Sequence, residues 1–224
     1  MEELPVEITE KKITFLQQQI LHWKQDNVAD FPWRHTTNRW HALVAEIMLQ
    51  RTRAEQVEPV YMWFAEKYEN PSDYVQDEDS QVFDSLGLVW RQKYLKELAI
   101  ILSKQSEIPS EKDALLRLPG VGHYIAAAYR SLHLGIRDVI IDSNVVRLYG
   151  RYFGFATHGE TRRRKWFREM ADAITPENEF RDFNYGLIDF TREICKPMPL
   201  QEVCPLNSMC VHYSEGARYN SSAY

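Results

Sequence analysis

The feature that most constrains this chain is the run Leu118-Pro119-Gly120-Val121-Gly122, which lies between two stretches with helical patterning. Pro119 fixes its own φ, while Gly120 and Gly122 permit positive φ and lack the Cβ atoms that would block close approach. The turn leaves unpaired N–H groups at the start of the helix that we expect near His123, and an anion can bind such groups. The run therefore predicts a helical hairpin that grips a phosphodiester through its backbone.

Apolar residues recur at three- and four-residue intervals along almost the whole chain, which is typical of amphipathic helices. Loops are expected at 30–37, 70–79, 106–110, 154–159 and 175–179. The one β-like run, Val139–Ile141, is too short to build a sheet, so the predicted fold class is all-α. The pattern predicts helices over Ile13–Trp23, Ala42–Leu49, Val57–Phe64, Gln81–Leu86, Gln92–Ser103, Asp113–Leu118, Tyr124–Leu132, Asn144–Phe153, Arg162–Ala173 and Phe183–Cys195.

We expect two helical lobes that share one cleft, with the hairpin and Asp142 facing it. The central lobe is predicted to span 30–140 and to include the helix-hairpin-helix at about 111–132. The remaining parts are a second lobe made of 1–29 and 141–213, which contains a cysteine loop at 195–210, and a flexible tail at 214–224.

The formal net charge of −5 argues mildly against a nucleic-acid partner, because domains that bind nucleic acids are usually basic. Basic residues cluster locally, as in Arg162–Lys165, and a basic face on an acidic chain is compatible with DNA. A solvated helix face is the simpler interpretation of any one such cluster.

No apolar run approaches the roughly 20 residues of a membrane span, and Met1-Glu2-Glu3 does not open a signal peptide. We therefore expect an intracellular protein that does not bind membranes. We also expect it to be a monomer.

Asp142 follows an apolar run and precedes a predicted helix start at Ser143. It could simply cap that helix, as aspartate commonly does. A carboxylate beside a phosphate-gripping hairpin can also stabilise positive charge that develops on a sugar. Its place downstream of the hairpin favours the chemical role.

Glu46 is a charged residue within the most apolar predicted helix. A buried acid must be paired, protonated or exposed in a pocket. Desolvation would raise its pKa and make it a proton donor. An ion pair with a nearby arginine explains Glu46 equally well.

Two further features could contact a base. Tyr124 follows the glycine turn, where its ring can stack on a base and its hydroxyl can bind the base edge. The segment from Gln50 to Arg53 is suited to filling a gap in a base stack, although a polar helix end would look similar.

Three cysteines, Cys195, Cys204 and Cys210, are clustered near the C-terminus. Three thiols could hold a metal or an iron–sulfur cluster, although four thiolates are the usual set. His212 could supply the fourth ligand of a zinc site. Ordinary reduced cysteines are an equally good interpretation.

Taken together, these residues resemble the endonuclease III-like, helix-hairpin-helix superfamily of DNA glycosylases. The similarity runs from about Phe31 to Cys210, and within the superfamily it is strongest to the thymine glycosylases that act on G·T and G·U mispairs. It implies two helical lobes that flank the DNA. The matching segments are Phe31–Arg34, Ala45–Thr52, Leu86–Leu88, Leu118–Tyr124, Ile141–Val145 and Arg181–Leu187.

The resemblance implies three catalytic residues. Asp142 matches the aspartate that stabilises the oxocarbenium-like sugar and assists water. Glu46 matches the glutamate with which MutY enzymes protonate the departing adenine. Tyr124 occupies the position where bifunctional members carry a Schiff-base lysine. Because tyrosine has no amine, no imine can form, and strand cleavage by β-elimination is not expected.

The resemblance also implies a set of residues that contact DNA. Leu88 matches the wedge that enters the duplex, and Arg51 or Gln50 matches the group that fills the vacated space. Gly120 and Gly122 match the hairpin glycines whose amides bind phosphate, with Val121 between them.

Many relatives bind a [4Fe–4S] cluster through four cysteines. Cys195, Cys204 and Cys210 match the first, third and fourth ligands, with one residue deleted after Cys195, and Gln201 occupies the second ligand position. The missing ligand favours loss of the cluster. The loop would then be held by packing of Pro197, Pro199, Leu200 and Leu206.

The resemblance implies a monofunctional DNA glycosylase of base excision repair, which removes thymine or uracil mispaired with guanine. Its partner would be double-stranded DNA with a mispaired or damaged base. A short MutY-type adenine glycosylase acting on A opposite 8-oxoG or G is the second hypothesis, because the chain has no room for the usual extra C-terminal domain. A catalytically idle DNA-binding module is the third, and the presence of both acids argues against it.

Overall fold

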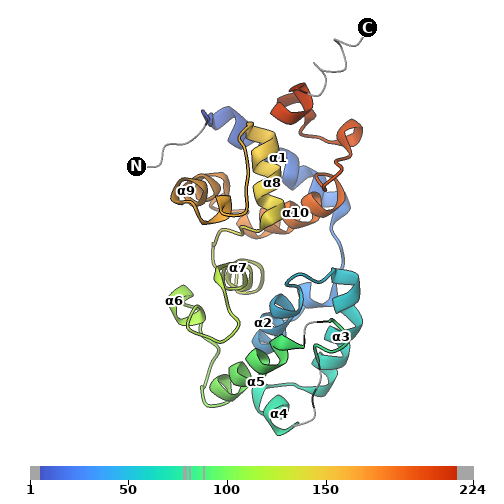
Figure 1. Ribbon diagram of the computed structural model, residues 1–224, viewed down its shortest axis with the longest axis vertical. Helices are drawn as coiled ribbons and strands as arrows, with labels where there is room; N and C mark the ends of the chain where they lie inside the picture. The colour runs from blue at the N-terminus through green and yellow to red at the C-terminus, as the bar shows by residue number, and fades with distance from the viewer. Residues whose placement is uncertain (1–5, 78–79, 81, 88, 216–224) are drawn as a thin grey trace. The chain divides into compact units, whose positions relative to one another are not determined.

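The computed structural model describes residues 6–77, 80, 82–87 and 89–215 (Figure 1). Regular structure in these ranges is helical and includes no strand, which confirms the predicted all-α class. No helix found there is long and apolar enough to cross a membrane. The helices are α1 (Glu10–Asn27), α2 (Arg39–Met48), α3 (Ala54–Lys67), α4 (Pro71–Gln76), α5 (Trp90–Leu102), α6 (Lys112–Leu115), α7 (His123–Ala128), α8 (Ser143–Phe153), α9 (Lys165–Ile174) and α10 (Phe180–Glu193).

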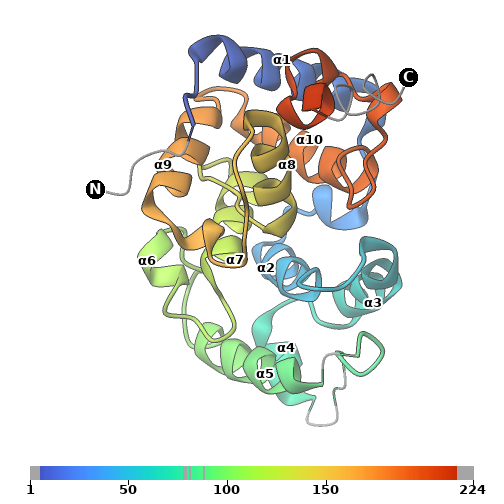
Figure 2. The ribbon, with the colours of Figure 1, turned by 45° about the horizontal axis from the view of Figure 1, so that its top comes forward.

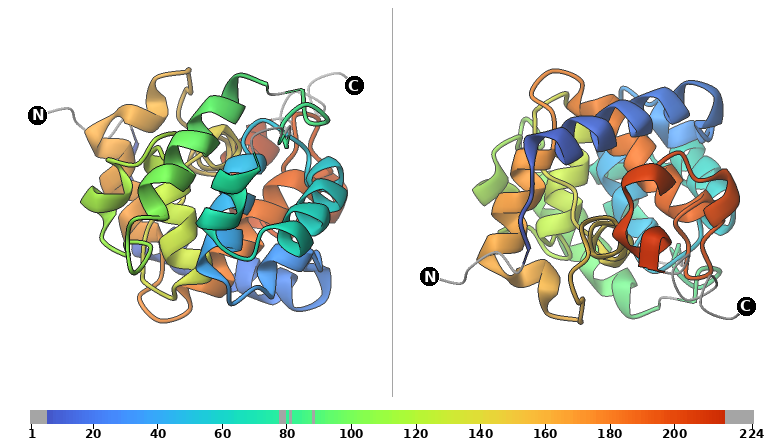
Figure 3. Two further views of the ribbon diagram at one scale, coloured as in Figure 1. Left: turned by 90° about the horizontal axis from the view of Figure 1, so that it is seen from below. Right: turned by 90° about the horizontal axis from the view of Figure 1, so that it is seen from above.

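The chain forms two compact units, one of which joins the residues up to Ala29 with those from Arg137 onward. In this unit α1 lies along α10, and α10 also packs against α8 (Figures 2 and 3). Trp23 of α1 meets Phe190 of α10 edge-on, with ring centroids 5.3 Å apart. This packing fixes the start of α8, where Asp142 lies. Other buried rings of the core are Tyr149, Tyr152, Phe153, Phe167 and Phe183.

The second unit, Asp30–Ile136, is built around α2. All residues from Trp40 to Met48 are buried, as expected for a helix that is apolar almost all round. Asn38 caps this helix by accepting hydrogen bonds from the amides of Trp40 and His41 at 2.9 and 3.2 Å. α2 packs against α3, α7 and the π-helical turn Tyr129–His133 that continues α7.

Two local predictions are wrong. Val82–Gly87 form turns and not the expected helix, and Gln81 lies outside the described residues. Pro71–Gln76, expected as a loop, form α4. Here Asn70 and Asp73 make a capping box, and Pro71 occupies the first turn, where a missing N–H leaves no intrahelical bond unmade.

The contact between α1 and α10 gives a test of the fold. A Cβ at Gly186 of α10 would lie 3.0 Å from Cγ2 and 3.2 Å from the carbonyl oxygen of Ile20. Overpacking costs about 1–3 kcal/mol, and the better helix propensity of alanine returns up to about 1 kcal/mol. We therefore expect Gly186→Ala to lower the free energy of unfolding in urea by about 1 kcal/mol. Gly159→Ala, where a Cβ meets nothing within 4 Å, is the matched control and should be neutral; equal stability of the two variants would contradict the packing.

Candidate active site

The predicted hairpin is present between α6 and α7. Gly120 has a φ of +76°, in the left-handed region, and a Cβ there would lie 3.3 Å from the Cβ of Tyr94. Gly122 differs from the expectation, because its φ of −95° is ordinary for any residue and a Cβ there would meet nothing within 4 Å. Of the two hairpin glycines, the backbone therefore requires only Gly120, whereas the space beside Gly122 is open to an outside group.

The end of the turn is the part that can offer amides to an anion. Val121 is buried, and its amide donates to the Leu118 carbonyl at 3.2 Å, so this residue serves the turn itself. Gly122 and His123 are exposed where α7 begins. The first amides of a helix have no intrahelical partner, which leaves them suited to phosphate.

Glu46 is buried in α2 and is paired. Its Oε1 lies 2.9 Å from Nε2 of His133, and the two side chains are each 3% exposed. The partner that the structure gives this acid is thus a histidine and not an arginine. His133 ends the π-helical turn, and such turns are frequent at functional sites. Tyr124, half-buried in the first turn of α7, belongs to the same helical segment.

Asp142 belongs to the other unit, where it caps α8. Its Oδ1 accepts hydrogen bonds from the amides of Asn144 and Val145 at 2.9 and 2.7 Å, and its Oδ2 accepts one from Nδ2 of Asn144 at 2.7 Å. The helix-cap interpretation is therefore correct. It leaves a chemical role open, because the residue is only partly buried.

Asn144, for which no role was predicted from the sequence, extends this network. Its Oδ1 accepts a hydrogen bond from Nη1 of Arg147 at 2.8 Å. Arg147 also donates to the carbonyls of Cys195 at 3.0 Å and Thr191 at 3.1 Å. The Asp142 carboxylate is thus oriented by a chain of hydrogen bonds that ends at the C-terminus of α10.

The segment after α2 has an unusual backbone. Gln50 and Arg51 follow Leu49, the C-cap of α2, and Arg51 is exposed with a φ of 58°. Positive φ is uncommon outside glycine and is found preferentially at functional sites. Leu88, the predicted wedge, lies outside the described residues.

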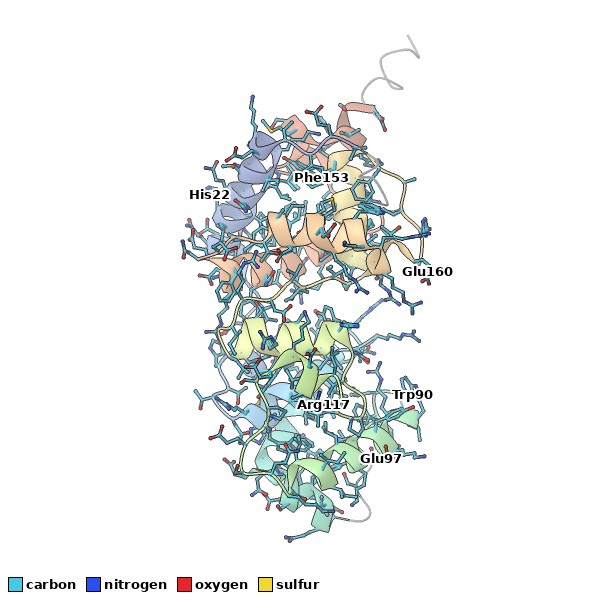
Figure 4. The ribbon with its side chains drawn as sticks, turned by 90° about the vertical axis from the view of Figure 1, so that its left-hand side faces the viewer. His22, Trp90, Glu97, Arg117, Phe153 and Glu160 are labelled. Atoms are coloured by element: carbon cyan, nitrogen blue, oxygen red, sulfur yellow. The ribbon has the colours of Figure 1, made fainter. Side chains whose placement is uncertain are left out.

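The start of α5 adjoins both the end of α2 and the hairpin. Buried Arg91 donates from Nη1 to the Ile47 carbonyl at 2.7 Å, and burial lowers the pKa of its guanidinium. Trp90, at the N-terminal end of α5 (Figure 4), is 57% exposed. Tyr94, one turn later, is 41% exposed and is the residue that contacts Gly120. An exposed aromatic pair therefore adjoins the hairpin turn.

The cysteines meet at one pocket but do not fit a cluster. The pocket offers three thiols, whereas a cluster is usually held by four thiolates, and the second ligand position is Gln201. Burial raises the pKa of Cys204 to about 11 and also raises the pKa of Cys210. Within the ranges that the structure describes, no group of three or more His, Cys, Asp or Glu residues could hold a metal ion. The zinc site predicted from these cysteines and His212 is therefore not formed by the described residues either. The pocket is lined by Cys195, Cys204 and Cys210 together with Arg151, Gln201 and His212.

An arginine of α8, rather than apolar packing alone, holds the cysteine loop. Arg151 donates from Nη1 to the Lys196 carbonyl at 2.7 Å and from Nη2 to the Pro197 carbonyl at 2.8 Å. Of the residues expected to pack, Leu206 is buried, whereas Pro197 is exposed and Leu200 is 43% exposed. The loop folds beside α8 and α10 in Figure 2.

No family model matches the chain. It is 35% identical over 212 residues to a thymine/uracil-DNA glycosylase of Methanothermobacter thermautotrophicus, a match that covers 92% of this chain and 96% of the relative. A thymine-DNA glycosylase of Aeropyrum pernix is 33% identical, with coverage of 91% and 96%. The chain belongs to the thymine/uracil-DNA glycosylase family of the helix-hairpin-helix superfamily. The predicted resemblance is therefore confirmed.

A solved structure agrees with this assignment. A thermostable thymine-DNA glycosylase matches with a TM-score of 0.86 at 35% identity, over 93% of this chain and all of that one. The two structures therefore share one fold over almost the whole of this chain. It was the pairing of Glu46 with His133 that sequence reasoning missed, because the two residues are 87 positions apart and nothing local marks the histidine.

The two hairpin glycines give a paired test. We expect Gly120→Ala to destabilise the protein by roughly 1–2 kcal/mol, because alanine is strained at positive φ. Gly122→Ala should cost less than about 1 kcal/mol, since only a helix N-cap preference changes. It should nevertheless weaken DNA binding about tenfold by placing a methyl group beside the amides that hold phosphate, where a hydrogen bond to a charged group is worth about 1.5–3 kcal/mol. Thermal unfolding and fluorescence anisotropy measure the two effects, and unchanged DNA affinity in Gly122→Ala would reject the phosphate grip.

Proposed function

We propose that this protein is a monofunctional DNA glycosylase that removes thymine or uracil mispaired with guanine in double-stranded DNA. The observation that carries the proposal is the Asp142 carboxylate, which three short hydrogen bonds orient at a partly exposed helix start. Membership of the thymine/uracil-DNA glycosylase family supports the choice of base.

Asp142 acts through its charge. Cleavage of the N-glycosidic bond leaves positive charge on the deoxyribose, and a carboxylate held in place beforehand stabilises that charge without reorganising. The same carboxylate can accept a proton from the attacking water. The donors from Asn144 and Val145 keep it oriented for both tasks.

Glu46 and Tyr124 act on the base. Glu46, as the carboxylic acid, donates a proton to the departing base and so neutralises the negative charge that the base acquires. Tyr124 binds the extruded base through its ring and hydroxyl. Because Tyr124 offers no amine, the sugar is attacked by water and the strand stays intact.

A panel of duplexes tests the reaction. Duplexes with G·T, G·U, A·8-oxoG and A·G are incubated with the protein and then treated with alkali, which cleaves the strand at abasic sites. We expect cleavage at thymine or uracil after alkali and none before it. Cleavage at adenine would identify a short adenine glycosylase, and binding without cleavage would identify an idle DNA-binding module.

A substitution of Asp142 separates its charge from its role as a cap. Asparagine is as good an N-cap as aspartate, so Asp142→Asn should fold and bind DNA while single-turnover excision falls by a factor of about 10²–10³. Asp172→Asn, an exposed carboxylate on α9 paired with Arg137, is the matched control and should excise normally. Near-normal excision by Asp142→Asn would reduce this residue to a helix cap.

We also propose that the protein functions without an iron–sulfur cluster. The loop supplies three thiols, with Gln201 at the second ligand position, and Arg151 donates hydrogen bonds to two of the loop's carbonyls. We expect purified protein to lack the visible absorption band of a cluster, also after incubation with iron and sulfide under reducing conditions. Cys210→Ser should keep the melting temperature and the excision rate. Stoichiometric iron, or unfolding of Cys210→Ser, would overturn the proposal.

A further inference from the structure

We propose that His133 is a positioning residue for Glu46, whose carboxyl group it holds by one oxygen so that the other can deliver a proton to the departing base. The proposal rests on the function proposed above. Nothing local in the sequence marks this histidine, and the structure alone brings it to the acid.

The geometry of the pair is that of a built site. Nε2 of His133 and Oε1 of Glu46 are 2.9 Å apart, and each side chain is 97% buried. The ring of Tyr129 lies beside the imidazole, with centroids 6.3 Å apart. Because both side chains are almost completely buried, they have little freedom to move, and the hydrogen bond holds Oε1 toward His133.

The second oxygen of Glu46 is the one left for chemistry. Within the described part of the chain, Oε1 is engaged by His133 and no residue hydrogen-bonds Oε2. Oε2 is not one of the buried polar atoms that lack both solvent contact and a hydrogen-bond partner. A small opening therefore reaches this oxygen, although the residue as a whole is 2% exposed.

The backbone around His133 fits this role. The π-helical turn Tyr129–His133 holds one more residue in its hydrogen-bonded turn than the α-helix α7 that it continues. Because of this extra residue, the side chain of His133 points in a different direction from the one it would have at the end of a regular α-helix. A purely structural contact with α2 could be made more cheaply by an apolar pair, because burying two polar groups costs desolvation. The π-helical turn and the buried polar pair together indicate that the position of His133 serves a function beyond packing.

The pairing assists proton donation in a specific way. A neutral imidazole with its proton on Nε2 donates to Oε1 throughout, and the transferred proton leaves Oε2 of Glu46 for the base. Glu46 becomes a carboxylate as the proton leaves, so the bond from His133 becomes charge-assisted and roughly twice as strong. An interaction that strengthens in the transition state raises the rate of the step itself and leaves substrate binding unchanged.

A double-mutant cycle tests this inference. His133→Leu should slow single-turnover excision at least tenfold, as part of the roughly 10²–10⁴-fold contribution of a general acid, with unchanged DNA affinity. His133→Gln, which can donate from a similar place, should recover most of the rate. In the Glu46→Gln background, His133→Leu should slow excision less than about twofold, because the group that it positions is gone. Equal slowing in both backgrounds would overturn the proposal.

Two further measurements keep the test independent of folding. In nitrogen NMR of the unsubstituted protein, His133 should carry its proton on Nε2, with a signal that shifts in Glu46→Gln; a neutral ring protonated on Nδ1 would overturn the proposal even if His133→Leu does not fold. His22→Gln, in α1 of the other unit (Figure 4), is the control and should change nothing. If Glu46→Gln excises the base at the normal rate, the proposed roles of Glu46 and His133 are both contradicted. If the unsubstituted protein excises no base, it is the proposed function that is contradicted.

Discussion

The burial of α2 is the constraint on which the hairpin unit depends. A helix with no exposed face must find partners for its polar side chains inside the protein, since unpaired buried groups are costly. His41 hydrogen-bonds the Tyr68 carbonyl at 2.9 Å, and Glu46 pairs with His133. These two contacts tie α2 to the end of α3 and to the turn that continues α7. The hairpin is therefore held against α2 by the same acid that we assign to proton donation.

In the other unit, the residue to which we assign a chemical role also has a structural one. Asp142 satisfies the first amides of α8 and, through Asn144 and Arg147, is linked to the end of α10. A carboxylate that caps a helix is already fixed in direction, so it needs no reorganisation to meet a developing charge. The two interpretations of Asp142 that the sequence left open are thus complementary, because capping is what gives the carboxylate its orientation.

The sequence predicts most of this fold, and its failures have physical reasons. Helical periodicity located α1, α8 and α10, and the glycine run located the hairpin, because both signals are local. The short helix at Pro71–Gln76 was missed, since its capping box outweighs the proline that suggested a loop. For the site, the cap at Asp142 was predictable, whereas the partner of Glu46 is fixed only by tertiary packing.

The cysteine loop has contacts that could hold it in place without a cluster, as we propose. A cluster contributes folding free energy by tying its loop to the rest of the domain. Here Arg151 donates hydrogen bonds to two backbone carbonyls of the loop, and Arg147 donates one to the carbonyl of Cys195. Leu206 of the loop is buried in the core. Hydrogen bonds from a charged donor are worth about 1.5–3 kcal/mol each, so a few of them offset much of what a cluster would supply. These bonds hold the loop beside α8, and Cys204 and Cys210 are partly buried there.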